Sequence, residues 1–449
     1  MERYDSYKDS GVKWLGEIPS HWDSASLLYL LRSKISDGPH ETPNLIDDGI
    51  PFISIDSLND SKEIDFSVVK KYISSKDYDR YCNKTILEKG DVLFSKAATI
   101  GKTAIVGEDK FMVWSPLAIL KPNYKKITSL YLYYIMNCKK AIEEVCLLGS
   151  KNTQINVGMR ELEKIRIPIP TLNEQNAISE FLDQEISKID AAIAQQQKMI
   201  DLLNERKQII INNAVTKGLD PSVPLINSGI DWIGQIPEGW KVYKIKNLIS
   251  LLTDYDANGS FSDIAKNCNI NTGNPYAWMV RTTDLVNKRF GIVEGNNYCD
   301  KSTYDYLAKS SLSPGDLLMT KRGNVGNVYL VPDYDRPMTL APNLYLLRTL
   351  RNKVNNKFLM YFLSSSNPQG QLALLNKSTT LGALYKDDVK ALNVVLPPLD
   401  VQNSLVDWIE DKIIDIERAI DCIKDMISLL QERKQIIIND VVTGKVKIV

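Results

Sequence analysis

The feature that most constrains the fold of this chain is an internal repeat whose segments recur in the same order. Residues 202–218 (LLNERKQIIINNAVTKG) return as residues 429–445 (LLQERKQIIINDVVTGK), and residues 10–22 (SGVKWLGEIPSHW) return as residues 228–240 (SGIDWIGQIPEGW). A chain that repeats whole segments in order is expected to build one scaffold twice. Its length of 449 residues is enough for two such domains and further helices.

The repeat is strong at the edges of each half and weak in the middle. Two further pairs of segments match, GDVLFSKAATIGKTAIV (90–106) with GDLLMTKRGNVGNVYLV (315–331) and IPIPTLNEQ (167–175) with VVLPPLDVQ (394–402). By contrast, DGPHETPNL (37–45) and DYDANGSFS (254–262) share nothing obvious. We interpret this as one scaffold that presents two different surfaces; the alternative is an old duplication whose loops drifted without purpose.

A long helix is predicted at the end of each half. Residues 173–217 contain neither proline nor glycine, which favours one helix of about 44 residues, or roughly 66 Å. Apolar residues recur at alternating spacings of three and four, the heptad pattern of a coiled-coil seam. The seam positions are Ile186, Ile189, Ile193, Gln196, Ile200, Leu203, Lys207, Ile210 and Ala214, then Ile413, Ile416, Ile420, Ile423, Ile427, Leu430, Lys434, Ile437 and Val441.

Each of the two apolar stripes needs a cover, and the simplest cover is the other copy, since the stripes have equal length. A pseudo-twofold axis between the halves would make the pair antiparallel, with the two globular regions separated by the helices. Polar seam residues such as Gln196, Lys207 and Lys434 are typical of positions that fix register. The alternative is a homodimer in which each seam pairs with a second chain.

Composition excludes several classes of protein. Lys plus Arg and Asp plus Glu both number 55, so net charge indicates neither a basic nor an acidic partner. Two histidines (His21 and His40) and six cysteines without a CxxC pair indicate no metal site and no disulfide framework. Apolar runs are too short for a membrane span, and the N-terminus has no apolar signal core. We therefore expect a soluble, cytoplasmic protein.

No catalytic centre is predicted. SKAATIGKT (95–103) ends like a phosphate-binding loop, but Lys96 stands where that loop requires glycine. GNPYAW (273–278) resembles the Asn-Pro-Pro-aromatic loop of amino-methyltransferases without its second proline. With no constellation of nucleophile, base or metal ligands, we expect a binding protein with no cofactor.

Basic and amide side chains in Gly-containing turns between apolar strands suit contacts to phosphates and base edges. A solvated turn is the alternative reading for each stretch alone, and the recurrence in both halves favours binding. The candidate residues for such contacts are Lys96, Thr99, Lys102, Asn152, Thr153 and Gln154 in the first half, and Arg281, Thr282, Lys321, Arg322, Asn324, Ser378 and Thr379 in the second.

Across nearly the whole chain, these motifs resemble the DNA specificity subunit of Type I restriction-modification enzymes. The resemblance rests on SGxxWxGxIPxxW, GDxLxxKxxxxG, the IPIPTLNEQ approach to the helix and LLxERKQxII. It implies an α+β fold: two target recognition domains of mixed α/β structure, separated by paired helical spacers that form an antiparallel coiled coil. It also implies double-stranded DNA, two methyltransferase (modification) subunits and restriction/translocase subunits as partners.

We expect target recognition domains at residues 1–170 and 219–396, and helical spacers at residues 171–218 and 397–449. Each domain would read one half of a split, asymmetric DNA site. The alternatives are a coiled-coil adaptor with no role in DNA binding and an enzyme, such as a methyltransferase or nuclease, with an unfamiliar site.

Overall fold

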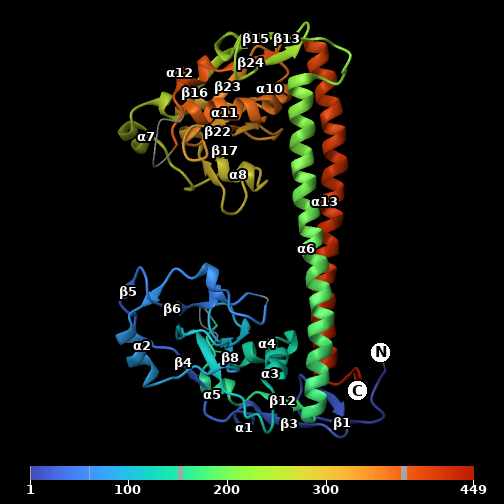
Figure 1. Ribbon diagram of the computed structural model, residues 1–449. Coiled ribbons are helices and arrows are strands. Elements are labelled where there is room, and N and C mark those ends of the chain that lie inside the picture. Colours follow the sequence, from blue (N-terminus) through green and yellow to red (C-terminus); the bar gives the residue numbers. More distant parts are fainter. Residues whose placement is uncertain (1, 60, 150–154, 376–381, 449) are drawn as a thin grey trace. The chain divides into compact units, whose positions relative to one another are not determined.

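The structure is a computed structural model that describes residues 2–59, 61–149, 155–375 and 382–448. It forms two compact units: Met1–Gln197 with Ile423–Val449 (unit 1), and Lys198–Cys422 (unit 2). Each unit contains one globular region and one half of each of two long helices, α6 (Leu172–Lys217) and α13 (Leu399–Val442) (Figure 1). The α+β fold with an internal repeat is confirmed.

The two long helices extend over the stretches that the sequence predicts. α6 has 46 residues and α13 has 44. At the start of α6, Thr171 Oγ1 accepts a hydrogen bond from the Glu174 N–H at 3.3 Å, and Glu174 Oε2 accepts one from the Thr171 N–H at 3.0 Å. This reciprocal pair is a capping box. The four-part division of the sequence stays a prediction, although both helices lie within its helical segments.

Within each unit the two helix halves pair in opposite directions. In unit 1, Lys434 Nζ on α13 donates to Asp190 Oδ1 on α6 at 2.8 Å. In unit 2, Lys207 Nζ on α6 donates to Glu417 Oε1 on α13 at 2.6 Å. The two ion pairs are the same pair in the two copies, because LLNERK and LLQERK contribute the lysines. Asp190 precedes Lys207 on α6, whereas its partner Lys434 follows Glu417 on α13, so the helices run antiparallel. The antiparallel coiled coil is confirmed.

All the predicted seam positions are buried or half-buried in the structure, including the polar Gln196, Lys207 and Lys434. Neighbours one residue away, such as Met199 and Leu429, are exposed. Each seam lysine brings its charge to a carboxylate at the edge of the seam. A displaced register would separate these charges, so the lysines favour one alignment of the helices.

Unit 1 has short strands that form two four-stranded and two two-stranded sheets, together with short helices. Its strands are β1 (Tyr7–Asp9), β2 (Glu17–Pro19), β3 (Asp23–Ser26), β4 (Ser36–Asp37), β5 (Leu45–Ile46), β6 (Ile50–Ile53), β7 (Tyr72–Ile73), β8 (Val92–Ser95), β9 (Thr103–Ile105), β10 (Met112–Val113), β11 (Leu117–Leu120) and β12 (Arg166–Ile169). Its shorter helices are α1 (Leu27–Leu30), α2 (Ser75–Cys82), α3 (Ser129–Met136), α4 (Lys139–Leu148) and α5 (Met159–Leu162).

Unit 2 repeats this plan with its own variations. Its strands are β13 (Leu225–Asn227), β14 (Gln235–Pro237), β15 (Lys241–Lys244), β16 (Ile249–Asp254), β17 (Ala277–Val280), β18 (Asn297–Cys299), β19 (Ser311–Leu312), β20 (Leu317–Thr320), β21 (Val328–Leu330), β22 (Met338–Leu340), β23 (Leu344–Thr349) and β24 (Asn393–Leu396). Its shorter helices are α7 (Phe261–Asn267), α8 (Thr282–Val286), α9 (Lys301–Tyr306), α10 (Asn356–Leu363), α11 (Ser366–Leu375) and α12 (Lys386–Ala391).

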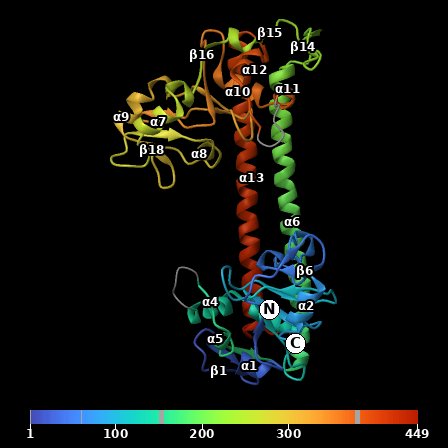
Figure 2. The ribbon, with the colours of Figure 1, turned by 90° about the vertical axis from the view of Figure 1, so that its left-hand side faces the viewer.

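The central sheet has the same strand order in both units, β4-β11-β8-β9 in unit 1 and β16-β23-β20-β21 in unit 2. β8 and β20 are buried along their whole length, which explains why each begins with three successive apolar residues. A second sheet contains one parallel pair in each unit, β6 with β10 and β17 with β22. Its other strands differ between the units, and in unit 2 they form a lobe with α7 and α9, apart from α10 and α12 (Figure 2).

A buried glutamine attaches each long helix to its globular region. Gln175 Oε1 accepts the N–H of Thr128 at 2.9 Å, and Gln175 Nε2 donates to the carbonyls of Lys126 and Pro170 at 2.9 and 3.0 Å. Gln402 makes the same three bonds in unit 2, with the N–H of Asn355 and the carbonyls of Lys353 and Pro397. This set explains the shared glutamine that ends both approach motifs.

The first and last described residues of the chain lie close together in unit 1 (Figures 1 and 2). Glu2 and Lys447 form an antiparallel bridge in which the Lys447 N–H donates to the Glu2 carbonyl at 2.9 Å. In unit 2 the corresponding path is a continuous connection from α6 to β13. Among the described residues, no helix combines the length and apolar character that a membrane crossing requires.

Candidate nucleic-acid interface

The predicted turns are two hairpin loops of the same design, residues 96–102 between β8 and β9, and residues 321–327 between β20 and β21. In the first, Ser95 Oγ donates to the carbonyl of Thr99 at 2.6 Å and accepts the N–H of Lys102 at 2.8 Å. In the second, Thr320 Oγ1 donates to the carbonyl of Asn324 and accepts the N–H of Asn327 at 2.9 Å. One hydroxyl at the end of a buried strand therefore shapes each loop.

Glycine is required where each loop returns toward its sheet. Gly101 has a φ of +99°, and a Cβ there would lie 2.7 Å from Ile142 on α4. Gly326 has a φ of +83°, and a Cβ there would lie 2.8 Å from Leu372 on α11. Because glycine has no side chain that would clash here, the loop can pack directly against the helix. The second glycine of the GDxLxxKxxxxG motif is thus structural.

The lysine of this motif turns inward in both units. Lys96 is 6% exposed, and its Nζ lies 3.1 Å from Asp37 Oδ2. Lys321 Nζ lies 2.8 Å from Asp254 Oδ2 and 2.6 Å from Asp256 Oδ2. Burial lowers the pKa of Lys321, but the two carboxylates outweigh it and raise the pKa above its ordinary value. Both candidate contacts, Lys96 and Lys321, therefore lie in internal ion pairs.

The acidic partners Asp37 and Asp254 are equivalent residues that the sequence comparison missed. Each ends the first strand of its central sheet, β4 or β16, and each pairs with the neighbouring strand, at Ala118 or at Tyr345. Burial raises the pKa of Asp254, but Lys321 and Lys386 outweigh it and hold the pKa below its ordinary value. The two stretches diverge directly after this aspartate, so the aspartate is a single matching residue that the comparison of segments could not distinguish from chance.

The side chains above these ion pairs differ between the units. In unit 1, His40 Nε2 lies 3.4 Å from Asp37 Oδ1, and its Nδ1 lies 3.1 Å from Ser115 Oγ. In unit 2, Lys386 Nζ lies 2.8 Å from Asp254 Oδ1. A pocket of about 480 Å³ adjoins the site in unit 1, lined in part by His40, Glu41 and Lys84. The same buried framework thus carries a different polar surface in each unit.

The remaining loop candidates lie at the surface. Thr99, Arg322 and Asn324 are exposed, and Lys102 is half-buried. Ala98 has a φ of +60° where unit 2 has Gly323 with a φ of +81°. The shared left-handed backbone makes the two loop tips equivalent despite their different side chains.

A second segment joins each hairpin loop. In unit 1, Ala97 bridges to Asn156, and the Val157 N–H donates to the Lys96 carbonyl at 2.9 Å. In unit 2, Arg322 bridges to Ala383, and the Leu384 N–H donates to the Lys321 carbonyl at 3.0 Å. The candidates Asn152, Thr153, Gln154, Ser378 and Thr379 precede these segments and lie outside the described residues.

Arg281 and Thr282 belong to the other sheet of unit 2, at the junction of β17 and α8. The Arg281 guanidinium donates to Asp284 from Nε at 3.2 Å and from Nη2 at 2.8 Å, and Nη2 also donates to the Gly295 carbonyl at 2.6 Å. Asp284 is only 2% exposed. Arg281 therefore stabilises the start of α8, which follows a strand of a different sheet from the one that carries the hairpin loop.

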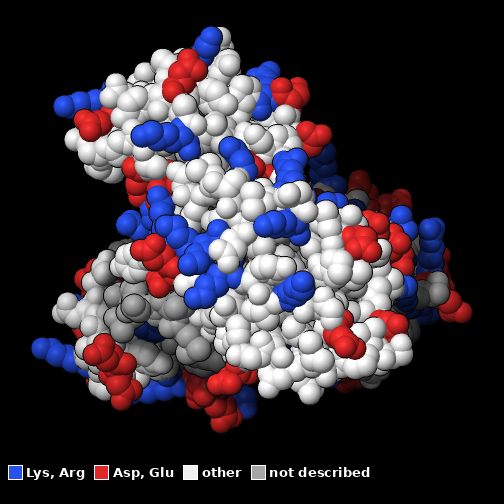
Figure 3. All heavy atoms as spheres, turned by 90° about the horizontal axis from the view of Figure 1, so that it is seen from above, with Lys and Arg blue, Asp and Glu red and all other residues white. Residues whose placement is uncertain are grey.

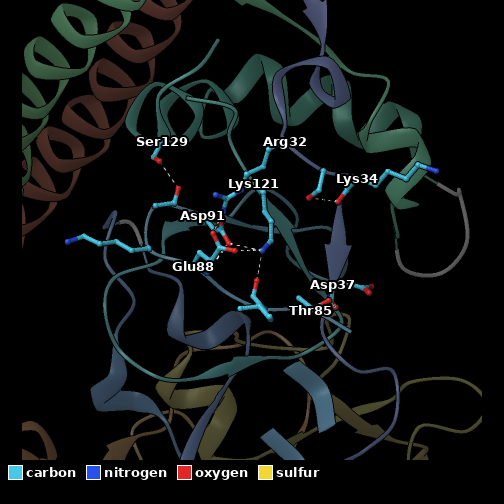
Figure 4. A network of polar contacts seen from close by, with 12 residues as sticks. Arg32, Lys34, Asp37, Thr85, Glu88, Asp91, Lys121 and Ser129 are labelled. Atoms are coloured by element: carbon cyan, nitrogen blue, oxygen red, sulfur yellow. Dashed lines mark hydrogen bonds and ion pairs between the residues drawn. The ribbon is translucent and has the colours of Figure 1, made fainter. Parts of the chain in front are cut away.

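The Gly-Asp that opens the motif is also structural. Asp91 is fully buried, and its carboxylate accepts from Arg32 Nη2 at 2.8 Å and from the Glu88 N–H at 2.9 Å, with Lys121 Nζ at 3.6 Å (Figure 4). Burial raises the pKa of Asp91, and Lys121 and Arg32 only partly offset this effect. The carboxylate therefore depends on its hydrogen-bond partners.

Asp316 is the equivalent residue in unit 2. It accepts from Arg348 Nε at 3.1 Å and Nη2 at 2.7 Å, and from the Ser313 N–H at 2.9 Å. This pairing raises the pKa of Arg348. Every charged residue of the shared motif is accordingly held in an internal ion pair, and the exposed side chains are those that the motif leaves variable.

Figure 3 shows Lys and Arg side chains interspersed with Asp and Glu side chains on the face seen from above. Among the described residues, no three His, Cys, Asp or Glu side chains are placed to hold a metal ion. The arrangement offers hydrogen-bond donors and acceptors on two loop tips and assembles no metal centre in the part that the structure describes.

Comparison with known proteins agrees with this arrangement. Residues 41–200 and 237–421 match the family described as the type I restriction modification DNA specificity domain. The putative type I restriction enzyme MjaX specificity subunit of Methanocaldococcus jannaschii is 27% identical, with 98% of each chain covered. The type I restriction enzyme EcoKI specificity subunit of Escherichia coli is 24% identical, with 88% of this chain and 82% of that one covered.

Among solved structures, the fold is similar to a chain described under complex assembly and conformational transition of the type I R-M system. The TM-score is 0.61 at 15% identity, with 96% of this chain and 99% of that chain covered. The likeness extends over both copies of the repeat and both long helices.

Proposed function

Because this chain belongs to the type I restriction modification DNA specificity family, we propose that it reads a bipartite, asymmetric DNA site and holds methyltransferase subunits over target adenines. Membership in this family makes it a non-catalytic subunit that confers DNA sequence recognition. Its two halves would each read one half-site, and the long helices would fix the number of unread base pairs between them.

One observation carries the two-surface proposal: the same buried framework supports two unlike loop tips. Both loops have the same shape because each is held by one hydroxyl and one ion pair. These are Ser95 with Lys96–Asp37 in unit 1, and Thr320 with Lys321–Asp254 in unit 2. The exposed positions then differ, with Arg322 replacing an alanine of unit 1. Equal scaffolds with unlike donors and acceptors suit two unlike sets of base edges.

Partner subunits follow from the chemistry of adenine modification. The exocyclic amine of adenine lies within the base stack, so a methyltransferase must extrude the base before it reacts. A non-catalytic chain can only position such an enzyme. We therefore propose two methyltransferase subunits and restriction/translocase subunits as partners, together with double-stranded DNA, in the cytoplasm.

A salt titration tests this division of roles. The chain has no net charge, and neutralisation of phosphates supplies much of the affinity for DNA. We expect the isolated chain to bind its target duplex with a Kd of roughly 1 µM or weaker at physiological salt, and the methyltransferase assembly with roughly 10 nM or tighter. Equal affinities of the chain and the assembly would contradict the proposal.

Replacement of Arg322 with alanine should weaken recognition of one half-site only. Arg322 is exposed at the tip of the second loop, and a bidentate contact to guanine is worth about 1 to 3 kcal/mol. Competition assays with duplexes mutated in either half-site measure the loss. Arg418→Ala, at an exposed position on α13, is the matched control. An unchanged preference at both half-sites would remove Arg322 from the interface.

A further inference from the structure

Unit 2 contains a pocket beside Trp240 whose lining residues take no part in the candidate interface. Its volume is about 230 Å³. Trp240 and Leu405 contribute apolar walls, and Val401 on the first turns of α13 closes one side. Gly218, with a φ of +72°, brings its backbone against the ring, since a Cβ there would lie 3.4 Å from Trp240.

In unit 1 the corresponding space is filled by a side chain of the protein itself. The ring of Tyr4 lies 5.6 Å from the ring of Trp22 at an interplanar angle of 66°. Tyr4 is 9% exposed and Trp22 is fully buried. Burial, followed by the nearby charge of Glu174, raises the pKa of Tyr4, so this phenol stays neutral. The edge-to-face contact is a favoured arrangement of two aromatic rings.

The two places are equivalent in the fold. Pro19 and Pro237 occupy the same position in the strand pairs β1–β2 and β13–β14. Counting back along the matched segments, Ser222 stands where unit 1 has Tyr4, and it is exposed. The residues around the tryptophan also differ between the units. Glu174, which accepts the Trp22 indole N–H at 3.0 Å, corresponds to Val401 in unit 2. Unit 2 therefore keeps the tryptophan and lacks the tyrosine.

We propose that the Trp240 pocket receives a tyrosine-like side chain from an extended segment of a partner protein. The pocket is smaller than the roughly 300 to 1,000 Å³ of a site for a drug-sized molecule, and it suits a single ring. Two carboxylates, Asp220 and Asp400, and one lysine, Lys217, line it. Charges of both signs around the pocket suit a ring whose neighbours also carry both signs, as Glu2, Arg3 and Asp5 do around Tyr4 in unit 1. The inference is independent of DNA recognition.

Calorimetric titration of the full chain with a capped peptide that copies residues 2–6 (ERYDS) tests the proposal. We expect the peptide to bind, and the peptide ERADS to bind at least tenfold more weakly. Ser222→Tyr, which supplies the missing ring from the chain itself, should weaken binding of ERYDS at least tenfold. Ser262→Tyr, at an exposed position on α7, should leave binding unchanged.

Ser404→Phe fills the pocket from α13 and repeats the test if Ser222→Tyr does not fold. Absence of peptide binding, or unchanged binding by both pocket-filling variants, would overturn the proposal. N-Acetyltyrosinamide is the third arm: affinity equal to that of the peptide would identify a site for small aromatic molecules in place of a protein segment. Weak or absent binding of this compound supports the peptide site.

Discussion

Inserting seven residues into α6 after Gln197 and seven into α13 after Lys424 is expected to abolish methylation of the native DNA site while both units stay folded. One heptad keeps the seam in phase and lengthens each helix by roughly 10 Å. At roughly 3.4 Å per base pair, this corresponds to about three base pairs. A reading surface displaced by that amount loses its base contacts, each worth about 1 to 3 kcal/mol, so methylation should fall at least roughly 100-fold.

The control for this insertion changes sequence without changing length: the seven residues after each insertion point are exchanged for the inserted heptad. Methylation of the native site should survive this exchange. Methylation of a plasmid that carries the native site is the measurement, with circular dichroism to establish that helix content is kept. Full methylation by the lengthened chain would show that the helices do not set the distance between half-sites.

Insertion into α6 alone should act through stability. The Lys434–Asp190 pair in unit 1 and the Lys207–Glu417 pair in unit 2 share one register. Lengthening only α6 by a heptad changes the separation of Asp190 and Lys207, so the two pairs can no longer form at the same time. The one-sided variant should therefore melt at a lower temperature than the two-sided variant, a result that a seam without register preference would not produce.

Replacing Asp91 with alanine is expected to destabilise the central sheet of unit 1 by about 3 kcal/mol. Loss of one partner from a buried ion pair costs about 3 to 5 kcal/mol when the remaining charge is left unpaired. The lower value applies because Arg32 keeps an ion pair with Glu88 at 2.7 Å, while the Glu88 N–H loses its acceptor. Hydrogen exchange of the amides in β8 and β11 measures the effect locally.

Asp109→Ala is the matched control, because Asp109 is an exposed aspartate in the same unit, and we expect a change below about 0.5 kcal/mol. Exchange in β20 and β23 should stay unchanged in both variants, since their sheet depends on Asp316. Equal exchange rates in Asp91→Ala and Asp109→Ala would show that the network around Asp91 adds little to the fold.

The repeat and the long helices were predictable because both depend on local sequence. Matching segments reveal a duplication directly, and a seam such as Ile186, Ile189 and Ile193 records which side of a helix is covered. The antiparallel direction followed from symmetry, and the pairs Lys434–Asp190 and Lys207–Glu417 confirm it. The small sheets were beyond reach, because strands of two residues such as β4 and β5 have no readable period.

The candidate interface was harder to predict because the sequence of a motif does not reveal whether its charged residue binds a ligand or pairs with another residue of the protein. Lys96 and Lys321 carry the signature of a phosphate contact, yet each is paired with an aspartate far away in sequence. Asp37 and Asp254 could have been found by testing which residue begins each divergent stretch. The tips with Thr99, Arg322 and Asn324 remain predicted contacts, and they follow from the turn chemistry that the sequence displays.

The most direct test of two unlike reading surfaces at a fixed spacing is a genome-wide map of methylated adenines in a host that expresses this chain with its methyltransferase subunits. We predict a single motif in two parts, with different bases in the two parts and one constant number of unspecified base pairs between them. A continuous motif, a palindromic motif or a variable gap would contradict this account.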